Sequence, residues 1–239
     1  MTVRDGAKAD TVHPVGTPLR VHAFVILLVI VSVIAFSVAG PAHWSMQPDL
    51  SWFALAGFLL AAIILADLFD IDMAFSFARV TVSVSSALQF GSALSLGPTA
   101  GAIVALLGAL VVEVVQRRDA VKLITNTANY ALSTFTAGLV YFSIATVADS
   151  PVGSVHNIGA LALAAAAFVM VNTGIVATAV AFTIGESPWR IWRADFQGVA
   201  FESLTLPTLG ALIPVLARES VFALVLVVIP LLGPYLAYR

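Results

Sequence analysis

The sequence predicts an all-α membrane protein, a polytopic bundle of about eight transmembrane helices, with six as the lower limit. Composition is the first reason: 60% of the 239 residues are hydrophobic and 10% are charged, whereas soluble domains carry about 25% charged residues. The second is a series of apolar runs, most of them long enough for the roughly 20 helical residues that cross a bilayer. The third is the distribution of positive charge when these runs are threaded alternately through a membrane.

The expected spans follow the apolar runs in chain order. They are Val21–Gly40, Trp52–Phe69, Val80–Leu96, Thr99–Val115, Ile124–Val147, Ile158–Ile184, Val199–Leu216 and Val221–Tyr238. The N-terminal residues are polar, and the first apolar run has full length without a small-residue cleavage site. We therefore expect residues 1–20 to form a tail and residues 21–239 to form a single membrane domain with an uncleaved first span.

Positive charge predicts the orientation. Ten of the 11 Lys and Arg residues lie on one side of the threading. They are Arg4, Lys8, Arg20, Arg79, Arg117, Arg118, Lys122, Arg190, Arg193 and Arg239. Only Arg218 lies on the other side. Because cytoplasmic loops carry the excess of Lys and Arg, both termini are expected in the cytoplasm. The predicted location is a bacterial cytoplasmic (inner) membrane, crossed several times.

The third span, Val80–Leu96, has an unusual pattern at its start. Residues 79–86 read Arg-Val-Thr-Val-Ser-Val-Ser-Ser, which alternates apolar and hydroxyl residues with the period of a strand. An isolated strand would leave its backbone polar groups unpaired in lipid. We therefore expect a helix or a partly broken helix here, with a re-entrant segment as the alternative.

The fourth span is expected to pack closely against a neighbouring helix. Gly97 and Pro98 leave almost no loop after the third span, so spans three and four should form a hairpin. Gly97 and Gly101 form a Gly-x-x-x-Gly pair, which lets helix backbones approach closely in membranes.

Two later connections carry informative residues. Ala148–Asn157 is expected as an outer loop. Gly185–Gln197 is expected on the cytoplasmic side, where Trp189 and Trp192 alternate with Arg190 and Arg193. This composition is typical of an amphipathic segment that lies on the cytoplasmic leaflet.

Polar residues at membrane depth provide the candidate binding site, because such residues are costly in lipid. They come from spans five, six and seven: Asn126, Asn129, Tyr130, Ser133, Asn172 and Glu202. All lie in the cytoplasmic half of their spans, so they are predicted to line one polar cavity for a small ligand. The alternative is hydrogen bonding between helices that stabilises the bundle.

Other acidic residues are expected at the inner ends of helices. Asp67 ends the second span, where water should reach it. Glu113 precedes Arg117 by four residues, a spacing that favours an ion pair on a helix. Glu202 has no basic residue in its own span, which makes it the best candidate for a functional ionisable group, with extension to the interface as the alternative.

Several classes of chemistry are excluded by what the sequence lacks. The chain has no cysteine, which rules out disulfides and thiolate chemistry. It has no P-loop and no His-Glu-x-x-His motif, and its four His residues lie in tails, loops or span ends. We therefore expect no enzymatic activity, no metal, no cofactor and no nucleic-acid partner.

Part of the chain resembles the N-terminal membrane region of bacterial HD-GYP, GGDEF and histidine-kinase signalling proteins. The motifs are Val82-Ser83-Val84-Ser85, Leu94 to Gly101, Gln116-Arg117-Arg118, Asn126 to Ser133, Val171 to Gly174 and Gly185 to Arg193. The Gly-Pro hairpin followed by a small-residue helix is also similar to five-helix receptor domains and to substrate-binding components of energy-coupling-factor transporters. The resemblance implies a sensory input module or a small-ligand binder.

The expected function is therefore that of an integral membrane sensory or ligand-binding domain. Its expected partners are membrane lipid, a small molecule, and a partner protein or output domain on the cytoplasmic side. The alternatives are a substrate-binding component of a vitamin-like transporter and a structural subunit of a membrane complex.

Overall fold

The computed structural model describes residues 19–39, 49–68, 71–75, 78–82, 85–146, 150–194 and 209–225. Within these ranges lie helices α1 (Leu19–Val38), α2 (Leu50–Leu68), α3 (Ser85–Leu96), α4 (Pro98–Val115), α5 (Ala120–Ile144), α6 (Val155–Ile184) and α8 (Leu212–Glu219), with the 3-10 helix η2 (Val221–Leu224) and strands β1 (Ile71–Phe75) and β2 (Ala78–Val82). Residues 188–194 are also helical. The first part of predicted span seven and most of span eight lie outside the described residues.

Four helices in the described ranges are long and apolar enough to cross a membrane: α1, α2, α4 and α6. Their bounds agree with the first, second, fourth and sixth predicted spans. α5, with 25 residues, is long enough as well, but its Asn, Ser and Thr residues make it more polar. The membrane class and the helical architecture thus agree with the sequence, while the total of eight spans and the cytoplasmic termini stay predictions.

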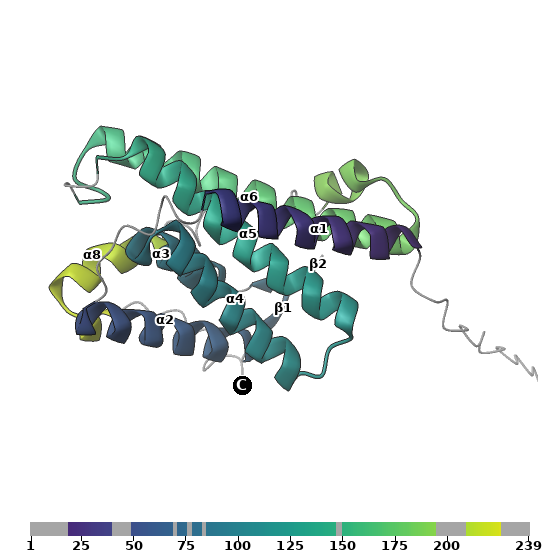
Figure 1. Cartoon of the computed structure of the whole chain (residues 1–239), viewed down its shortest axis with the longest axis horizontal. Helices are drawn as coiled ribbons and strands as arrows, with labels where there is room; N and C mark the ends of the chain where they lie inside the picture. Colours follow the sequence, from purple (N-terminus) through teal and green to yellow (C-terminus); the bar gives the residue numbers. More distant parts are fainter. Residues whose placement is uncertain are drawn as a thin grey trace, which may run out of the picture.

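α5 occupies the centre of the bundle. It packs against α4, α6, α3 and α1, and α4 in turn packs against α3 and α2 (Figure 1). α8 lies against α3, and the main contacts of α1 are with α5 and α6. The central position explains why α5 can be polar, since Asn129, Ser133 and Thr134 are buried among other helices rather than facing lipid.

Short polar side chains begin three of the helices. Asp49 accepts hydrogen bonds from the backbone N–H of Trp52 and the hydroxyl of Ser51, both at 2.8 Å, at the start of α2. These bonds favour the charged carboxylate and lower the pKa of Asp49 below its usual value. Asp119 caps α5 by accepting from the Lys122 N–H, and Ser154 caps α6 in the same way.

The third predicted span differs most from expectation. The predicted helix over Val80–Leu96 is wrong at its start, because α3 begins at Ser85 and residues 78–82 form strand β2. β2 pairs antiparallel with β1, from Ile71 opposite Val82 to Phe75 opposite Ala78. The partner strand pairs the backbone groups on the facing edge of β2, which an isolated strand would leave unpaired. α3 has 12 residues, which at 1.5 Å per residue gives about 18 Å, too short to cross a bilayer.

The expected tight hairpin at Gly97-Pro98 is confirmed, although it joins the short helix α3, and not a full span, to α4. α3 ends at Leu96, and α4 begins at Pro98. Gly97 between them has φ 87°, a conformation that favours glycine, and proline is well suited to the first position of a helix. This turn returns the chain so that α3 and α4 pack against each other, with Leu88 and Leu96 of α3 in one cluster with Ala100 and Val104 of α4.

Glycines allow the helices to approach closely. A Cβ added at Gly101 would lie 2.6 Å from the Cα of Ala93, so α4 meets the backbone of α3 there. A Cβ at Gly108 would lie 2.6 Å from the Ile63 side chain of α2. Gly91 of α3 faces Gly210 and Ile213. The predicted role of Gly101 in helix packing is therefore confirmed, and the same device holds α2 and α8 in place.

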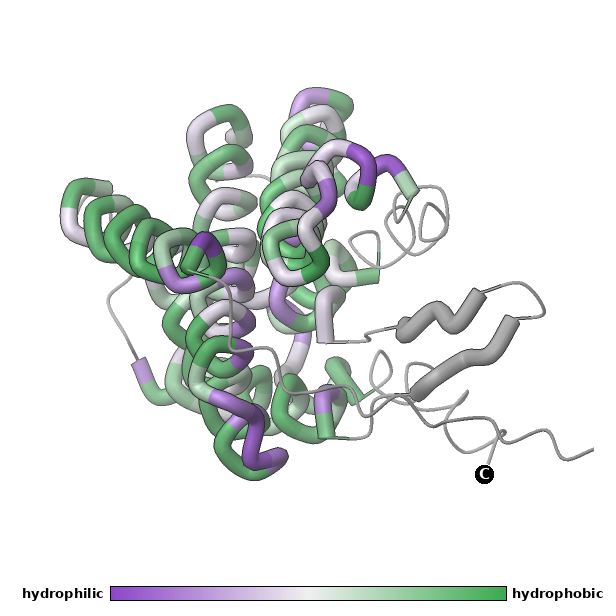
Figure 2. The backbone as a smooth tube through the Cα atoms, turned by 90° about the vertical axis from the view of Figure 1, so that its right-hand side faces the viewer, coloured by the Kyte–Doolittle hydropathy of each residue, from purple (hydrophilic) through white to green (hydrophobic). Residues whose placement is uncertain are grey.

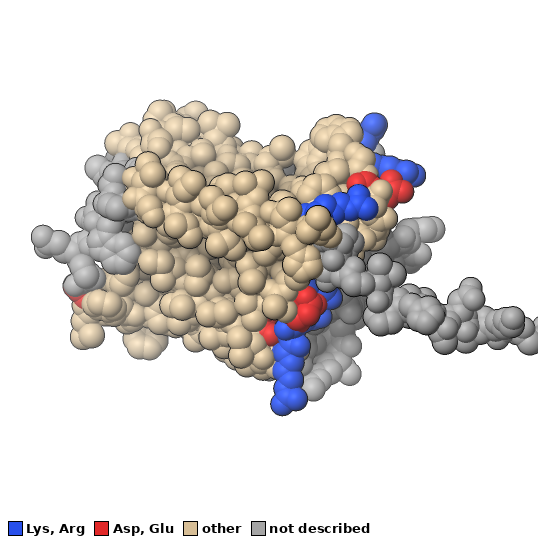
Figure 3. Space-filling view, turned by 45° about the vertical axis from the view of Figure 1, so that its right-hand side comes forward, with Lys and Arg blue, Asp and Glu red and all other residues tan. Residues whose placement is uncertain are grey.

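The two ends of the bundle differ in charge. The basic end is formed by the start of α1, the α4–α5 connection and residues 185–194; the α8 end is formed by the end of α3, the α5–α6 connection and α8. Along the helices the residues are mostly apolar, with hydrophilic residues gathered where helices end (Figure 2). Charged side chains cluster at one end beside a broad uncharged band (Figure 3). The basic end carries Arg20, Arg117, Arg118, Lys122, Arg190 and Arg193.

Candidate functional site

Five of the residues predicted as a ligand site are described: four lie on α5 and one lies on α6. We call these five residues the seam: Asn126, Asn129, Tyr130, Ser133 and Asn172. Asn129 is 1% exposed and donates through Nδ2 to the Oδ1 of Asn172 on α6, at 2.8 Å. The Ser133 hydroxyl donates to the backbone carbonyl of Asn129, at 2.8 Å. The structure therefore brings residues of predicted spans five and six together through a hydrogen bond between helices, as the alternative to a ligand cavity predicts. Whether they also bind a ligand stays a prediction.

Asn126 belongs to the same seam but has a different partner. Its Nδ2 donates to Oε1 of Glu113 on α4, at 2.7 Å. Glu113 is only 7% exposed. The predicted ion pair between Glu113 and Arg117 is absent from the described residues, because α4 ends at Val115 and Arg117 turns out of the helix with φ 53°. A bond between α4 and α5 replaces it.

The remaining predictions for polar residues have mixed outcomes. Tyr130 is half-buried on α5, where its backbone carbonyl accepts from Ser133 at 3.3 Å. Asp67 is 5% exposed, so the expectation of a solvated position at the end of α2 is wrong. Its position in the packed α2 end removes it from water. Glu202 lies outside the described residues.

We expect Asn172→Ala to lower stability, because the Nδ2 of Asn129 would lose its partner inside the bundle. Interhelical bonds of this kind contribute about 0.6 kcal/mol on average and at most about 1.7. A loss of about 1 kcal/mol corresponds to a fall of about 2–4 °C in the unfolding midpoint. Thermal unfolding in lipid nanodiscs measures this fall.

Thr178→Ala serves as the control, because the Thr178 hydroxyl only donates to the Gly174 carbonyl within α6. It should leave the midpoint nearly unchanged. If Asn172→Ala kept the wild-type midpoint but lost ligand binding, the seam would be a binding site instead of a structural pairing.

A pocket of about 250 Å³ lies elsewhere, at the α8 end. Its described walls come from α2, α3, α5, the α5–α6 connection and α8. The lining residues are Leu55, Leu94, Ser95, Tyr141, Phe142, Pro151, Pro214, Ala217 and Arg218. None of the five described residues predicted as a ligand site is among them.

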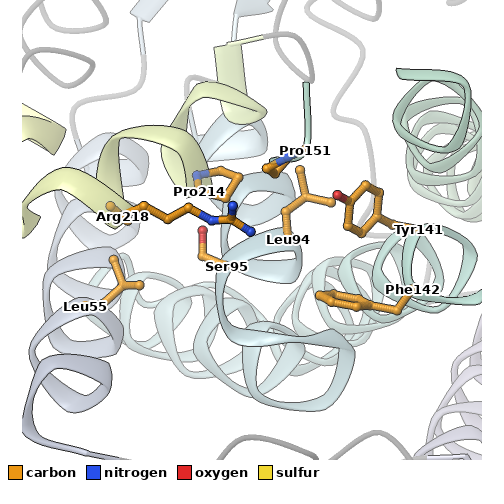
Figure 4. Close-up of a pocket in the computed structure, with 9 residues that line it drawn as sticks. Leu55, Leu94, Ser95, Tyr141, Phe142, Pro151, Pro214 and Arg218 are labelled. Atoms are coloured by element: carbon orange, nitrogen blue, oxygen red, sulfur yellow. The ribbon is translucent and has the colours of Figure 1, made fainter. Parts of the chain in front are cut away.

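The pocket combines an apolar wall with three polar groups. Arg218 reaches from α8 toward Ser95, and the Tyr141 ring lies across the same space (Figure 4). The Ser95 hydroxyl oxygen is buried and makes no hydrogen bond to the described residues. Phe142 packs edge-to-face against Tyr141, with ring centroids 5.2 Å apart. Aromatic and aliphatic walls with a few directed polar groups are typical of small-molecule sites.

The local sequence explains how these groups meet. The Gly97-Pro98 turn places Ser95 in the last turn of α3, close to the end of the bundle. Gly91 and Gly210 let α8 approach α3 with hardly any space between their backbones. Arg218 lies in the last turn of α8, so this approach brings its side chain to the end of α3.

Sequence reasoning did not find this pocket, although two features pointed toward it. Arg218 is the one basic residue on the side opposite the rest. Tyr141 lies on the same helical face of span five as Asn126 and Tyr130. Nothing local predicts that these residues converge, because Ser95 and Arg218 are 123 positions apart in the sequence.

At the basic end, the predicted amphipathic segment is helical over residues 188–194. Trp189 and Trp192 stack with ring centroids 5.1 Å apart. The Trp192 indole N–H donates to the Thr173 hydroxyl at 2.9 Å, which attaches the segment to α6. Arg190 pairs with Glu186 at 3.1 Å, and Trp189 is 65% exposed.

Among the described residues, no three His, Asp or Glu side chains lie close enough together to hold a metal ion. Comparison with known proteins gave no matching family model, no matching curated protein and no matching solved structure. The resemblance to bacterial sensor regions thus stays a prediction.

Proposed function

We propose that this protein is a membrane-embedded ligand-binding domain that serves as the input module of a signalling system and catalyses no reaction of its own. The observation that carries the proposal is the pocket at the α8 end. Four helices and one connection from distant parts of the chain contribute to its walls. A bound molecule would therefore touch several elements at once and could favour one arrangement of them over another.

α5 provides a route from the pocket to the opposite end of the bundle. Tyr141 and Phe142 line the pocket near the end of α5. Near the start of the same helix, Asn126 holds Glu113 of α4, close to the basic end. A small rotation or shift of α5 on binding would change that contact and the α4–α5 connection. In this proposal a partner protein or output domain binds at the basic end and responds to the altered position of the α4–α5 connection.

We place the basic end in the cytoplasm of a bacterial cell and the pocket on the outer side of the inner membrane, because cytoplasmic loops carry the excess of Lys and Arg. The chain has no cysteine, so single cysteines report the orientation directly. A membrane-impermeant maleimide added to whole cells with a permeable outer membrane should label Glu219→Cys and leave Lys122→Cys unlabelled. The reverse pattern would invert the orientation.

Filling the pocket tests the proposed function. Ala217 lines the pocket from α8, so Ala217→Phe should occupy much of its volume. A small-molecule library should contain compounds that raise the unfolding midpoint of the wild type in nanodiscs, and Ala217→Phe should abolish these shifts.

Ala166→Phe, on an exposed position of α6, is the matched control and should keep the shifts. The proposal is wrong if no compound shifts the wild type or if the shifts persist in Ala217→Phe. Movement of a bound compound into sealed vesicles would instead favour the transporter alternative.

A further inference from the structure

We propose that the pocket at the α8 end binds a small organic acid, a carboxylate monoanion with a compact apolar body about the size of one ring. This inference rests on the proposed function, because it names the chemical class of the ligand for the same pocket. Three properties of the pocket support it: its charge, its unpaired hydroxyl and its size.

Charge favours an anion. Arg218 supplies a permanently protonated guanidinium with five N–H donors, so it can hold a protein partner and still donate to a ligand. None of the described lining residues is acidic. Glu219 follows Arg218 in the chain but does not line the pocket. A carboxylate matches the planar guanidinium with two parallel charge-assisted hydrogen bonds, which are about twice as strong as those to a neutral acceptor.

The Ser95 hydroxyl supplies a second, directed contact. Its oxygen is buried and unpaired in the described part of the chain, and leaving a buried hydroxyl without a partner is unfavourable. Arg218 and Ser95 both line the pocket, and Arg218 extends from α8 toward Ser95 (Figure 4). A carboxylate held by the guanidinium can accept a hydrogen bond from this hydroxyl as well.

Size and wall chemistry limit the rest of the ligand. The pocket has about 250 Å³, whereas an apolar cavity of about 150 Å³ holds benzene. The added volume suits one carboxylate on a single ring or on a short branched chain. Leu55, Leu94 and Phe142 offer this body an apolar surface. Drug-sized ligands use about 300–1,000 Å³, so a long acyl chain would not fit inside.

Three probes of equal size and different charge test the proposal: benzoate, benzamide and benzylamine. The protein is placed in nanodiscs of zwitterionic lipid, which keeps anionic headgroups from competing, and binding is measured by calorimetry. Benzoate should bind in a saturable way, benzamide at least about tenfold more weakly, which is about 1.4 kcal/mol, and benzylamine not detectably.

Variants assign the charge preference to its residues. Arg218→Gln should weaken benzoate binding at least tenfold and leave the weak benzamide binding unchanged. Arg218→Lys should restore part of the affinity, because it keeps the charge and loses the paired geometry. Ser95→Ala should weaken benzoate binding several-fold. Arg117→Gln at the basic end is the matched control and should bind benzoate as the wild type does.

The outcomes separate this inference from the proposed function. If all three probes bind equally and Ala217→Phe removes their binding, the pocket is a binding site without preference for acids, and only this inference is wrong. Tighter binding of laurate than of benzoate would show that a lipid acyl chain is the occupant and would also overturn it. Failure of benzoate to bind at millimolar concentration would overturn it directly.

Discussion

Gly101→Ala should lower the unfolding midpoint by about 6–12 °C. The added methyl group would lie 2.6 Å from the Cα and N of Ala93 and from the carbonyl oxygen of Ser92. These are backbone atoms, which cannot move aside as a flexible side chain would, so α3 and α4 must separate. Overpacking typically costs about 1–3 kcal/mol and occasionally more. Because the contacted atoms belong to the backbone, we expect about 3 kcal/mol, and about 2–4 °C is lost per kcal/mol in a chain of this size.

The separation would also break the hydrogen bond from the Ser92 hydroxyl to the Gly101 carbonyl, 3.2 Å long. Gly101→Leu should be more severe and leave little folded protein. Thermal unfolding and the monodisperse fraction in size-exclusion chromatography measure both effects. Gly57→Ala in α2 is the matched control, because a Cβ there meets nothing within 4 Å. A wild-type midpoint in Gly101→Ala would mean that the two helices are not in contact at this point.

Asn157→Ala should have a comparable effect at the α8 end. Asn157 is fully buried, and its side chain makes three hydrogen bonds to the α5–α6 connection. Its Oδ1 accepts from the Thr146 N–H at 2.9 Å, and its Nδ2 donates to the carbonyls of Thr146 and Ser150 at 3.2 and 3.1 Å. Removing them leaves three backbone groups unpaired, at about 1–3 kcal/mol each if fully buried.

Because the connection lies at the end of the bundle, where water can replace part of these bonds, we expect a total loss of about 3 kcal/mol. Ser143→Ala is the control, since the exposed Ser143 hydroxyl only donates to the Leu139 carbonyl within α5. Hydrogen exchange should show faster exchange of the Thr146 amide in Asn157→Ala. Unchanged exchange there would contradict the assigned role of Asn157.

Local chemistry made much of the fold predictable. The hairpin between α3 and α4 depends only on the adjacent residues Gly97 and Pro98, so the sequence alone is enough to predict it. The apolar runs that became α1, α2, α4 and α6 were recognisable because length and hydropathy are enough to identify such helices.

The failures involve partners that are distant in sequence. The strand period at residues 79–86 was visible, but only a second strand at Ile71–Phe75 makes a strand feasible there. The spacing of Glu113 and Arg117 predicts an ion pair, but α4 ends at Val115 before Arg117. Glu113 instead accepts a hydrogen bond from Asn126 on α5. Likewise, the pocket depends on how α8 is rotated against α3, which no periodicity in either segment determines.

The contact between α1 and the centre of the bundle has a consequence for biosynthesis. Leu28 of α1 packs with Ala128 and Leu132 of α5, about 100 residues later in the chain. Ribosomes add about 5–20 residues per second, so α1 waits roughly 5–20 seconds in the bilayer before its partner emerges. During that time every side of the helix faces lipid. α1 suits this requirement, because every residue from Val21 to Val38 is apolar except His22 and two serines. The bundle can then assemble when α5 packs against a helix that is already inserted.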